Sequence, residues 1–563
     1  MASTASVGDA GPALLSRERI IAKPGFNRWL VPPAALCIHL CIGMAYGFSV
    51  FWKPLQAALL GADGKALPEC SAGAVTFAEK SIGTLHALTA TDCNWSQFDL
   101  GWMYTFFFVL LGVSAAIWGG WLERVGPRKA GLVSAMCWCG GLLIAAFGVY
   151  IHQLWLMWLG AGVIGGIGLG LGYISPVSTL IKWFPDRRGM ATGMAIMGFG
   201  GGAMIGSPLA EILMTHYRTA TSVGVWETFV TLGLIYFVFM LCGAFGYRLP
   251  RPGWKPEGWT PPQKSHAMIA TGHVHLKDAH KTPQFWLLWA VLCLNVSAGI
   301  GIIGIASPML QEIFGGALVG QPDLGFEQVQ AESGLKSSAA LVAAGFVGLF
   351  SLFNIAGRFF WASLSDKIGR KLTYYTFFTL GFICYASAPT LANLGLLAMF
   401  AAAFCLIASM YGGGFATIPA YLADVFGTQF VGAIHGRLLT AWSTAGIVGP
   451  VIVNYMREAR LAAGVPRDQL YDPIFYVLSG LLVAGFIANL LIRPLHKKWF
   501  MKEEEVADLQ AVDRKAAERI KAAAPTRGGE KFDIRAVLAW AAVGIPLAWG
   551  VWITLGKALV LFR

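Results

Sequence analysis

Thirteen long apolar stretches constrain this chain more than any other feature of its sequence. An α-helix needs about 20 such residues to cross the hydrocarbon core of a bilayer. The chain has 56% hydrophobic and 13% charged residues and a mean hydropathy of +0.60, and this composition excludes a soluble globular protein. The sequence therefore predicts an all-α integral membrane protein of twelve spans and a thirteenth, which lie at 29–52, 99–121, 130–150, 154–181, 189–212, 226–247, 284–310, 338–361, 372–390, 394–422, 430–454, 473–493 and 536–556.

Basic residues outnumber acidic residues by 42 to 30, but they gather in short clusters between the apolar stretches. We interpret these clusters as topology signals and expect no nucleic-acid partner. Most of them follow even-numbered spans, so the positive-inside rule predicts that the N-terminus is cytoplasmic and that the protein is multi-pass in the inner (plasma) membrane. Residues 1–28 lack an apolar core with a small-residue cleavage site, so we expect no cleaved signal peptide.

The segments outside the spans divide the chain. Residues 53–98 predict an outer loop in which Cys70 and Cys93 either pair or stay reduced, depending on the compartment. The Pro-, Gly- and Trp-rich stretch 248–283 is typical of a linker between two halves. The predicted organisation is a cytoplasmic tail 1–28, a six-helix half 29–247, a cytoplasmic linker 248–283, a second half 284–494, a charged cytoplasmic tail 495–535 and an extra membrane helix 536–563.

The two halves carry similar motifs. The segment "ERVGPRK" at 123–129 matches "DKIGRKL" at 366–372, an offset of 243 residues, and "YISPVSTLIKWF" at 173–184 pairs with "FATIPAYLADVF" at 415–426. Two similar six-span halves joined by a linker are the parallel-repeat plan of secondary transporters. In that plan the substrate site lies near the membrane midplane, between the halves.

The loops after spans 2 and 8, "GGWLERVGPRK" (119–129) and "ASLSDKIGRK" (362–371), resemble the signature loops of the major facilitator superfamily, with Glu123 where Asp is usual. The resemblance covers about residues 29–494 and implies the fold of two six-helix halves. The charged residues of these loops could form contacts between helix ends in one conformation and break them in another, which would gate the transport path. The alternative is that these charges only set the membrane topology. The predicted gating residues are Glu123, Arg124, Arg128, Asp366, Lys367 and Arg370.

Within that superfamily, four segments are similar to the oxalate/formate antiporter family, which is related to the monocarboxylate carriers: "GMAYGFSVFWKPL" (43–55), "GGIGLGLGYISP" (165–176), "GRFFWASLSDKIGR" (357–370) and "HGRLLTAWSTAGIVGP" (435–450). The resemblance implies transport of small carboxylate anions without a cofactor. The glycines of 165–172 favour close helix packing over a nucleotide site, because no strand precedes them and no GxxxxGK[ST] loop occurs.

Arg358 stands inside an otherwise uncharged run. It precedes Asp366, at the predicted cytoplasmic end of span 8, by eight residues. Eight helical residues rise about 12 Å, which places the guanidinium near the middle of a core about 30 Å thick. An arginine at that depth is costly unless it faces water or an anion, and its fork of donors matches a carboxylate. Its repeat counterpart is Ala115, so the charge is not part of the shared scaffold; snorkelling and an ion pair with a buried acid are the alternatives.

The resemblance also implies further site residues. Oxalate-exchanging members pair an arginine in span 8, which Arg358 matches, with a lysine in a "TAK" motif of span 11; here that motif reads "TAW" and ends in Trp442. One arginine without the lysine favours a monocarboxylate such as formate, pyruvate or lactate over oxalate. The same motifs imply an aromatic cage around the substrate, formed by Tyr46, Tyr173, Tyr411 and Phe415.

Three other polar residues in the spans are weaker candidates. Asn354 lies one turn before Arg358, where the related monocarboxylate carriers have an aspartate, and it could orient the arginine or contact substrate. His39 in span 1 could carry a coupled proton, although a hydrogen-bonded buried histidine is the alternative. Asn295 in span 7 is a predicted cavity-lining amide. No spacing of catalytic or metal-ligating residues predicts an enzyme or a metal site.

The sequence thus predicts a secondary active transporter of small carboxylate anions. We expect alternating access, as an antiporter or a proton symporter, by a monomer in the lipid bilayer. Two alternatives stay open: an oxalate/formate dicarboxylate exchanger, and a membrane receptor or accessory subunit on a carrier fold. The charged tail and the thirteenth span favour the second of these alternatives.

Overall fold

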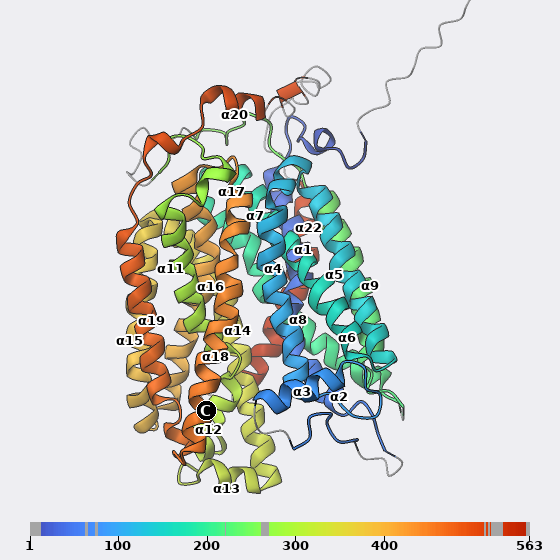
Figure 1. The fold of residues 1–563 in the computed structure, drawn as a ribbon. Coiled ribbons are helices and arrows are strands. Elements are labelled where there is room, and N and C mark those ends of the chain that lie inside the picture. Colours follow the sequence, from blue (N-terminus) through green and yellow to red (C-terminus); the bar gives the residue numbers. More distant parts are fainter. Residues whose placement is uncertain are drawn as a thin grey trace, which may run out of the picture.

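The computed structural model describes residues 13–61, 66–73, 77–219, 221–259, 269–509 and 533–558, together with residues 511, 514, 515 and 518. In these residues every extended element is a helix, and β-structure is limited to isolated bridges. The long helices run side by side in two adjacent bundles (Figure 1). The predicted all-α membrane architecture is confirmed.

The first bundle is built from the N-terminal half of the chain. Its first span changes from α-helix to 3₁₀-helix part-way along, at Gly43, and its fourth contains a π-helical stretch after its first turn. Its elements are η2 Arg28–Leu30, α1 Val31–Ile42, η3 Gly43–Phe51, α4 Gln97–Val125, α5 Pro127–Tyr150, α6 Leu154–Met157, η4 Trp158–Gly165, α7 Gly166–Trp183, α8 Arg188–Tyr217 and α9 Val225–Gly246.

The second bundle follows the linker. Its elements are α11 Pro283–Ile303, α12 Ala306–Phe314, α13 Phe326–Ala331, α14 Ser333–Ile368, α15 Arg370–Asn393, α16 Leu397–Phe426, α17 Val431–Leu438, α18 Thr440–Ala462 and α19 Asp472–Leu491. Across the described parts of the chain, twelve helices are long and apolar enough to cross a membrane. The predicted ninth span, α15, is not among them because its threonines and tyrosines lower its hydropathy, but it packs in the bundle against α16 and α19.

The two ends of the bundles carry different segments, which we call the linker face and the loop face. The linker face carries residues 13–28, the described parts of 248–283 and α20 Glu503–Leu509. There isolated β-bridges join the linker to both terminal segments, Leu249 with Ile21 and Val274 with Phe500. The loop face carries α2 Trp52–Gln56, α3 Phe77–Ala87 and α13 (Figure 1).

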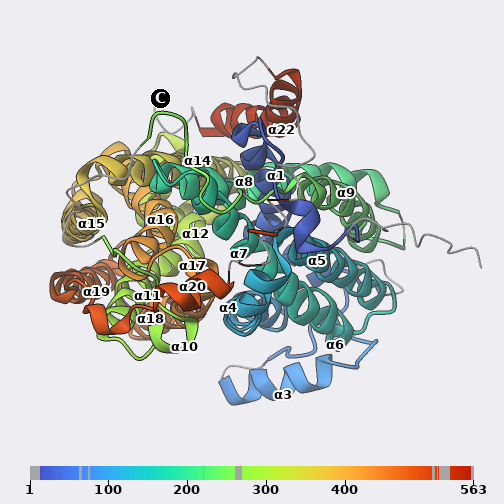
Figure 2. The ribbon, with the colours of Figure 1, turned by 90° about the horizontal axis from the view of Figure 1, so that it is seen from above.

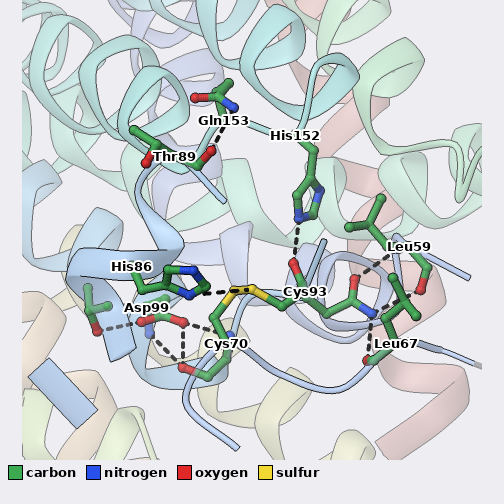
Figure 3. Close-up of a disulfide and its surroundings, with 12 residues drawn as sticks. Leu59, Leu67, Cys70, His86, Thr89, Cys93, Asp99, His152 and Gln153 are labelled. Carbon is green, nitrogen blue, oxygen red and sulfur yellow. Dashed lines mark hydrogen bonds between the residues drawn. A yellow bond between two sulfur atoms is a disulfide. The ribbon is translucent and has the colours of Figure 1, made fainter. Parts of the chain in front are cut away.

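The outer loop on the loop face is held by a disulfide between Cys70 and Cys93 (Figure 3). The sequence left this pairing open, and the structure forms it. Nε2 of His152 donates to the Cys93 carbonyl at 2.9 Å. Ser96 caps the start of α4 and forms a capping box with Asp99. His86 also lies beside the bridge, but sulfurs that are bonded to each other are not thiolates and therefore do not offer a metal site.

The extra C-terminal helix, α22 Ile534–Ala558, packs on the outside of both bundles (Figure 2). Its first turns reach the start of α1, where the Trp540 indole donates to the Trp29 carbonyl at 3.1 Å. Further along, Leu547 lies against Gly201 of α8 and Thr554 against Gly348 of α14. The helix therefore covers the seam where α8 and α14 meet.

Candidate functional site

Arg358 lies on α14 at the contact between the two bundles and is fully buried. Its Nε donates to Oδ1 of Asn354 at 2.9 Å, as expected for two residues one turn apart. Its Nη1 donates to the carbonyl of Ile196 in α8 at 3.1 Å, so the guanidinium joins the two bundles. Its Nη2 is buried without a hydrogen-bond partner. The protein therefore holds Nε and Nη1, while Nη2 lies in the same site as the Tyr46 hydroxyl, which also interacts with this guanidinium.

Two glycines let the backbones around Arg358 approach closely. A Cβ at Gly412 of α16 would lie 2.2 Å from the Asn354 carbonyl oxygen, and one at Gly193 of α8 would lie 2.7 Å from the Arg358 carbonyl oxygen. Real side chains do not reach such distances, so α14 can sit between α8 and α16 only because these positions are glycine. The close packing fixes the depth and direction of the arginine.

Aromatic rings from both bundles surround the arginine. Its Cζ lies 5.9 Å from the Phe199 ring centre and 5.7 Å from that of Phe415. The fully buried Trp442 of α18 forms the centre of the ring cluster. Its ring centre lies 4.3 Å from Phe415, 5.4 Å from Phe108, 5.4 Å from Tyr173, 5.5 Å from Phe199 and 6.2 Å from Tyr46. Thus α18, α16, α7, α4, α8 and η3 each contribute a ring to one cluster.

Several donors in this ring cluster lack an acceptor. Besides Arg358 Nη2, the Tyr173 hydroxyl and the Trp442 indole nitrogen are buried without a hydrogen-bond partner. The hydroxyls of Tyr46 and Tyr411 lie 3.4 Å apart, and the charge of Arg358 acts on both tyrosines and on Tyr173. Buried polar atoms are normally paired, so this concentration of unpaired donors needs an explanation. An electron-rich acceptor, such as an anion, would supply the missing partner.

Asn295 lies apart from the ring cluster. Its side chain lines a small cavity of about 10 Å³ inside the second bundle, with room for about one water molecule. The cavity is bounded by Gly299, Phe377 and Tyr411, among others, all from that bundle. The structure therefore brings Arg358, Asn354, Tyr46, Tyr173, Tyr411, Phe415 and Trp442 together, and leaves Asn295 behind Tyr411.

The second signature loop joins the bundles at the linker face. The Asp366 carboxylate accepts from the backbone amides of Gly189 and Met190, at 2.7 and 2.8 Å, which are the first amides of α8. A carboxylate at a helix N-terminus satisfies free amides and complements the helix dipole. Asp366 also pairs with Arg370 at 2.6 Å. These contacts close the linker face.

Asp424 of α16 completes this linker-face cluster. It pairs with Arg370 at 3.2 Å within its own bundle and with Arg188 of α8 at 3.0 Å across the interface. Sequence reasoning missed both Asp424 and Arg188. The repeat contained a signal, because Asp424 stands in "FATIPAYLADVF" where Lys182 stands in "YISPVSTLIKWF".

The first signature loop keeps its contacts mostly within the first bundle. Glu123 accepts from Lys182 at 2.6 Å and from Ser178 at 2.7 Å. The repeat counterparts of Glu123 and Lys182 are Asp366 and Asp424, two carboxylates that both pair with Arg370 instead. It also lies against Gly432, next to the start of α17. The Arg128 guanidinium donates to the Leu14 and Phe245 carbonyls, at 3.0 and 3.3 Å.

The two remaining predicted gating residues are peripheral. Arg124 and Lys367 are exposed at the linker face. Neither side chain contributes to the described network that joins the bundles.

Sequence comparison assigns the family. A model of the Major Facilitator Superfamily matches residues 69–450 and 333–562. The chain belongs to the Major Facilitator Superfamily. The superfamily resemblance and its fold, predicted from the signature loops, are thereby confirmed, and the family is one of transporters.

Relatives within the superfamily agree with the closer resemblance. The oxalate:formate antiporter of Oxalobacter formigenes is 26% identical over 397 residues, which cover 69% of this chain and 82% of that protein. Monocarboxylate transporter 4 of Rattus norvegicus is 24% identical over 452 residues, which cover 77% of this chain and 86% of that protein. The solved E. coli fucose:proton symporter has a TM-score of 0.52 at 12% identity, covering 82% of this chain and 99% of that one, which supports the fold alone.

Two buried histidines of this superfamily member lie beside the ring cluster. The His39 ring stacks on Tyr173 at 5.4 Å. The His435 ring, on α17, lies 5.9 Å from Tyr173 on another side, and neither of its nitrogens has a hydrogen-bond partner. Sequence reasoning singled out His39 but missed His435, whose only signal was its place in the span-11 motif "HGRLLTAW".

Proposed function

We propose that this protein is a secondary active transporter of small monocarboxylate anions such as formate, pyruvate or lactate. The observation that carries the proposal is the set of unpaired buried donors around Arg358. Nη2, the Tyr173 hydroxyl and the Trp442 indole can each donate to a carboxylate oxygen, and no described carboxylate forms an ion pair with the guanidinium. A single carboxylate matches one available side of one guanidinium.

The contacts between the bundles suggest how transport proceeds. The ion pair and helix-end contacts that join the bundles, Asp424 with Arg188 and Asp366 with α8, lie at the linker face. We take this face to be cytoplasmic in the plasma membrane, in agreement with its basic clusters. The anion then enters from the loop face and neutralises Arg358. The Asp366 and Asp424 contacts break as the bundles rock and open the cytoplasmic side.

A dicarboxylate exchanger is the second candidate, because the oxalate:formate antiporter of Oxalobacter formigenes is a relative. Against it, the position that would hold the second cation is Trp442, whose ring packs among Phe415, Phe108 and Tyr173. A second carboxylate would be buried there without a positively charged partner, which is costly.

Uptake into proteoliposomes tests the proposal. Purified protein reconstituted with internal unlabelled pyruvate is expected to take up labelled formate, pyruvate or lactate faster than protein-free liposomes. Neutral lactamide should not compete, because it offers no charge to Arg358, and oxalate should compete weakly. Competition by oxalate stronger than that of the three monocarboxylates would favour the dicarboxylate exchanger. Absence of uptake of all four acids would favour a receptor or accessory subunit.

A further inference from the structure

His39 lies on α1 and is packed between α7 and α8. It is fully buried, and each of its ring nitrogens faces a backbone carbonyl oxygen: Nδ1 that of Ala195 in α8, and Nε2 that of Tyr173 in α7 at 3.2 Å. A neutral imidazole has one N–H and one lone pair, so it can donate to only one of these oxygens. The other carbonyl would then face a lone pair. The imidazolium donates to both.

A proline adds a third carbonyl. Pro176 lies inside α7, and because proline has no amide hydrogen, the Gly172 carbonyl four residues earlier has no helical donor. That carbonyl also acts on His39. Three carbonyl dipoles, one of them released from its helix, therefore direct negative charge at this ring, as they would around a bound cation.

The charged groups nearby oppose a proton at His39 unless an anion is present. The charge of Arg358 on α14 acts on His39, His39 in turn acts on His435 of α17, and Tyr173 of α7 stacks on His39. Other titratable groups around α1 are Cys37 and Cys41 on the same helix, Tyr46 of η3, Cys139 of α5, Cys242 and Tyr236 of α9, and Arg28 of η2, which pairs with Asp186.

The remaining neighbours bring no charge. The neighbours of His39 from α8 are Ala195, Gly198 and Phe199. From α22, Leu547 lies near Leu40, the next residue of α1. The one carboxylate among the groups named around His39, Asp186, pairs with Arg28 and does not pair with Arg358. A carboxylate bound at Arg358 would remove the repulsion that acts on the imidazolium.

We propose that His39 is the proton-binding residue of a proton–monocarboxylate symporter. This inference rests on the proposed function and adds its coupling. The proton comes from water on the side from which the substrate enters and adds to the unprotonated ring nitrogen of His39. It leaves to water on the opposite side of the membrane. The carboxylate stays ionised on Arg358 throughout. Because each ligand relieves the cost of the other, the two bind together, and linkage makes this coupling equal in both directions.

Proton uptake on binding tests the coupling directly. Detergent-solubilised wild-type protein in weak buffer with a pH dye is given pyruvate, while bound labelled pyruvate is counted in parallel. About one proton is expected to be taken up per pyruvate bound, because the coupling is one to one. His39→Gln, which keeps a donor but cannot titrate, is expected to bind pyruvate without proton uptake. Binding by the wild type without proton uptake would overturn the inference and leave the proposed function standing.

Accumulation in proteoliposomes gives a second readout. With the membrane potential clamped to zero, an interior more alkaline by one pH unit is expected to raise steady-state pyruvate accumulation by about tenfold in the wild type. His39→Gln should lose this response while still exchanging internal for external pyruvate at a reduced rate. The matched control is His216→Gln, at an exposed histidine near the loop-face end of α8, which should keep the response.

The outcomes separate the two proposals. If the wild type moves no monocarboxylate, both the proposed function and the inference fail. If His435→Gln abolishes the response to the pH gradient and His39→Gln keeps it, the proton site is His435 and the inference is wrong. Should His39→Gln fail to give a monodisperse protein, His39→Asn, which also keeps a donor but cannot titrate, replaces it in both measurements.

Discussion

Arg358→Ala is expected to lower uptake of labelled pyruvate by about a hundredfold or more, equivalent to about 3 kcal/mol of lost binding free energy. The guanidinium is fully buried, and no other described cation lies in the ring cluster. Without it, a carboxylate would enter an aromatic site with hydroxyl and indole donors but no opposite charge. Initial rates in proteoliposomes measure the effect.

Two further variants show whether the loss reflects recognition. Arg358→Lys keeps the charge but loses the planar fork, so an intermediate loss of about tenfold is expected. Arg218→Ala removes an exposed arginine just beyond the loop-face end of α8 and should transport like the wild type. If folded Arg358→Ala protein transports pyruvate at the rate of Arg218→Ala, Arg358 does not bind substrate.

Trp442→Lys is expected to shift the preference of the carrier toward dicarboxylates. The indole lies at the centre of the ring cluster, 5.5 Å between ring centres from Phe199, and the Phe199 ring also lies beside the Arg358 guanidinium. An ammonium at this position would provide a partner for a second carboxylate, opposite Arg358. The ratio of oxalate to pyruvate uptake is expected to rise by about tenfold or more, a difference of about 1.4 kcal/mol.

The control for this variant removes the indole without adding charge. Trp442→Phe loses the unpaired indole donor and should lower uptake of both acids, with no change in their ratio. If Trp442→Lys folds and its ratio equals that of Trp442→Phe, the residue in span 11 does not set the number of carboxylates.

The fold was predictable from sequence because the bilayer imposes simple rules. A helix must be long and apolar to cross, and a charge within it stands out. The structure buries Arg358 at the contact between the two bundles, and its depth in the membrane stays a prediction. The family motifs likewise predicted that one group of aromatic residues lies around the substrate, and in the structure these residues form one cluster: Tyr46, Tyr173, Tyr411, Phe415 and Trp442.

Other features depend on contacts between distant residues, which no local pattern shows. Asn295 lies in a span at a depth suited to a cavity, but its side chain faces the interior of its own bundle. Asp424 closes the linker face because it meets Arg188 across the interface. The two carbonyls at the nitrogens of His39 come from α7 and α8, and they become visible only when the helices are packed.

A structure with bound pyruvate tests the central claim most directly, namely that a single carboxylate binds between the bundles at Arg358. The account predicts density for the substrate in the ring cluster, with one carboxylate oxygen within hydrogen-bond distance of Arg358 Nη2 and of the Tyr173 hydroxyl or the Trp442 indole. Pyruvate density beside Asn295 or elsewhere, with Arg358 Nη2, Tyr173 and Trp442 all still without a partner, would contradict it.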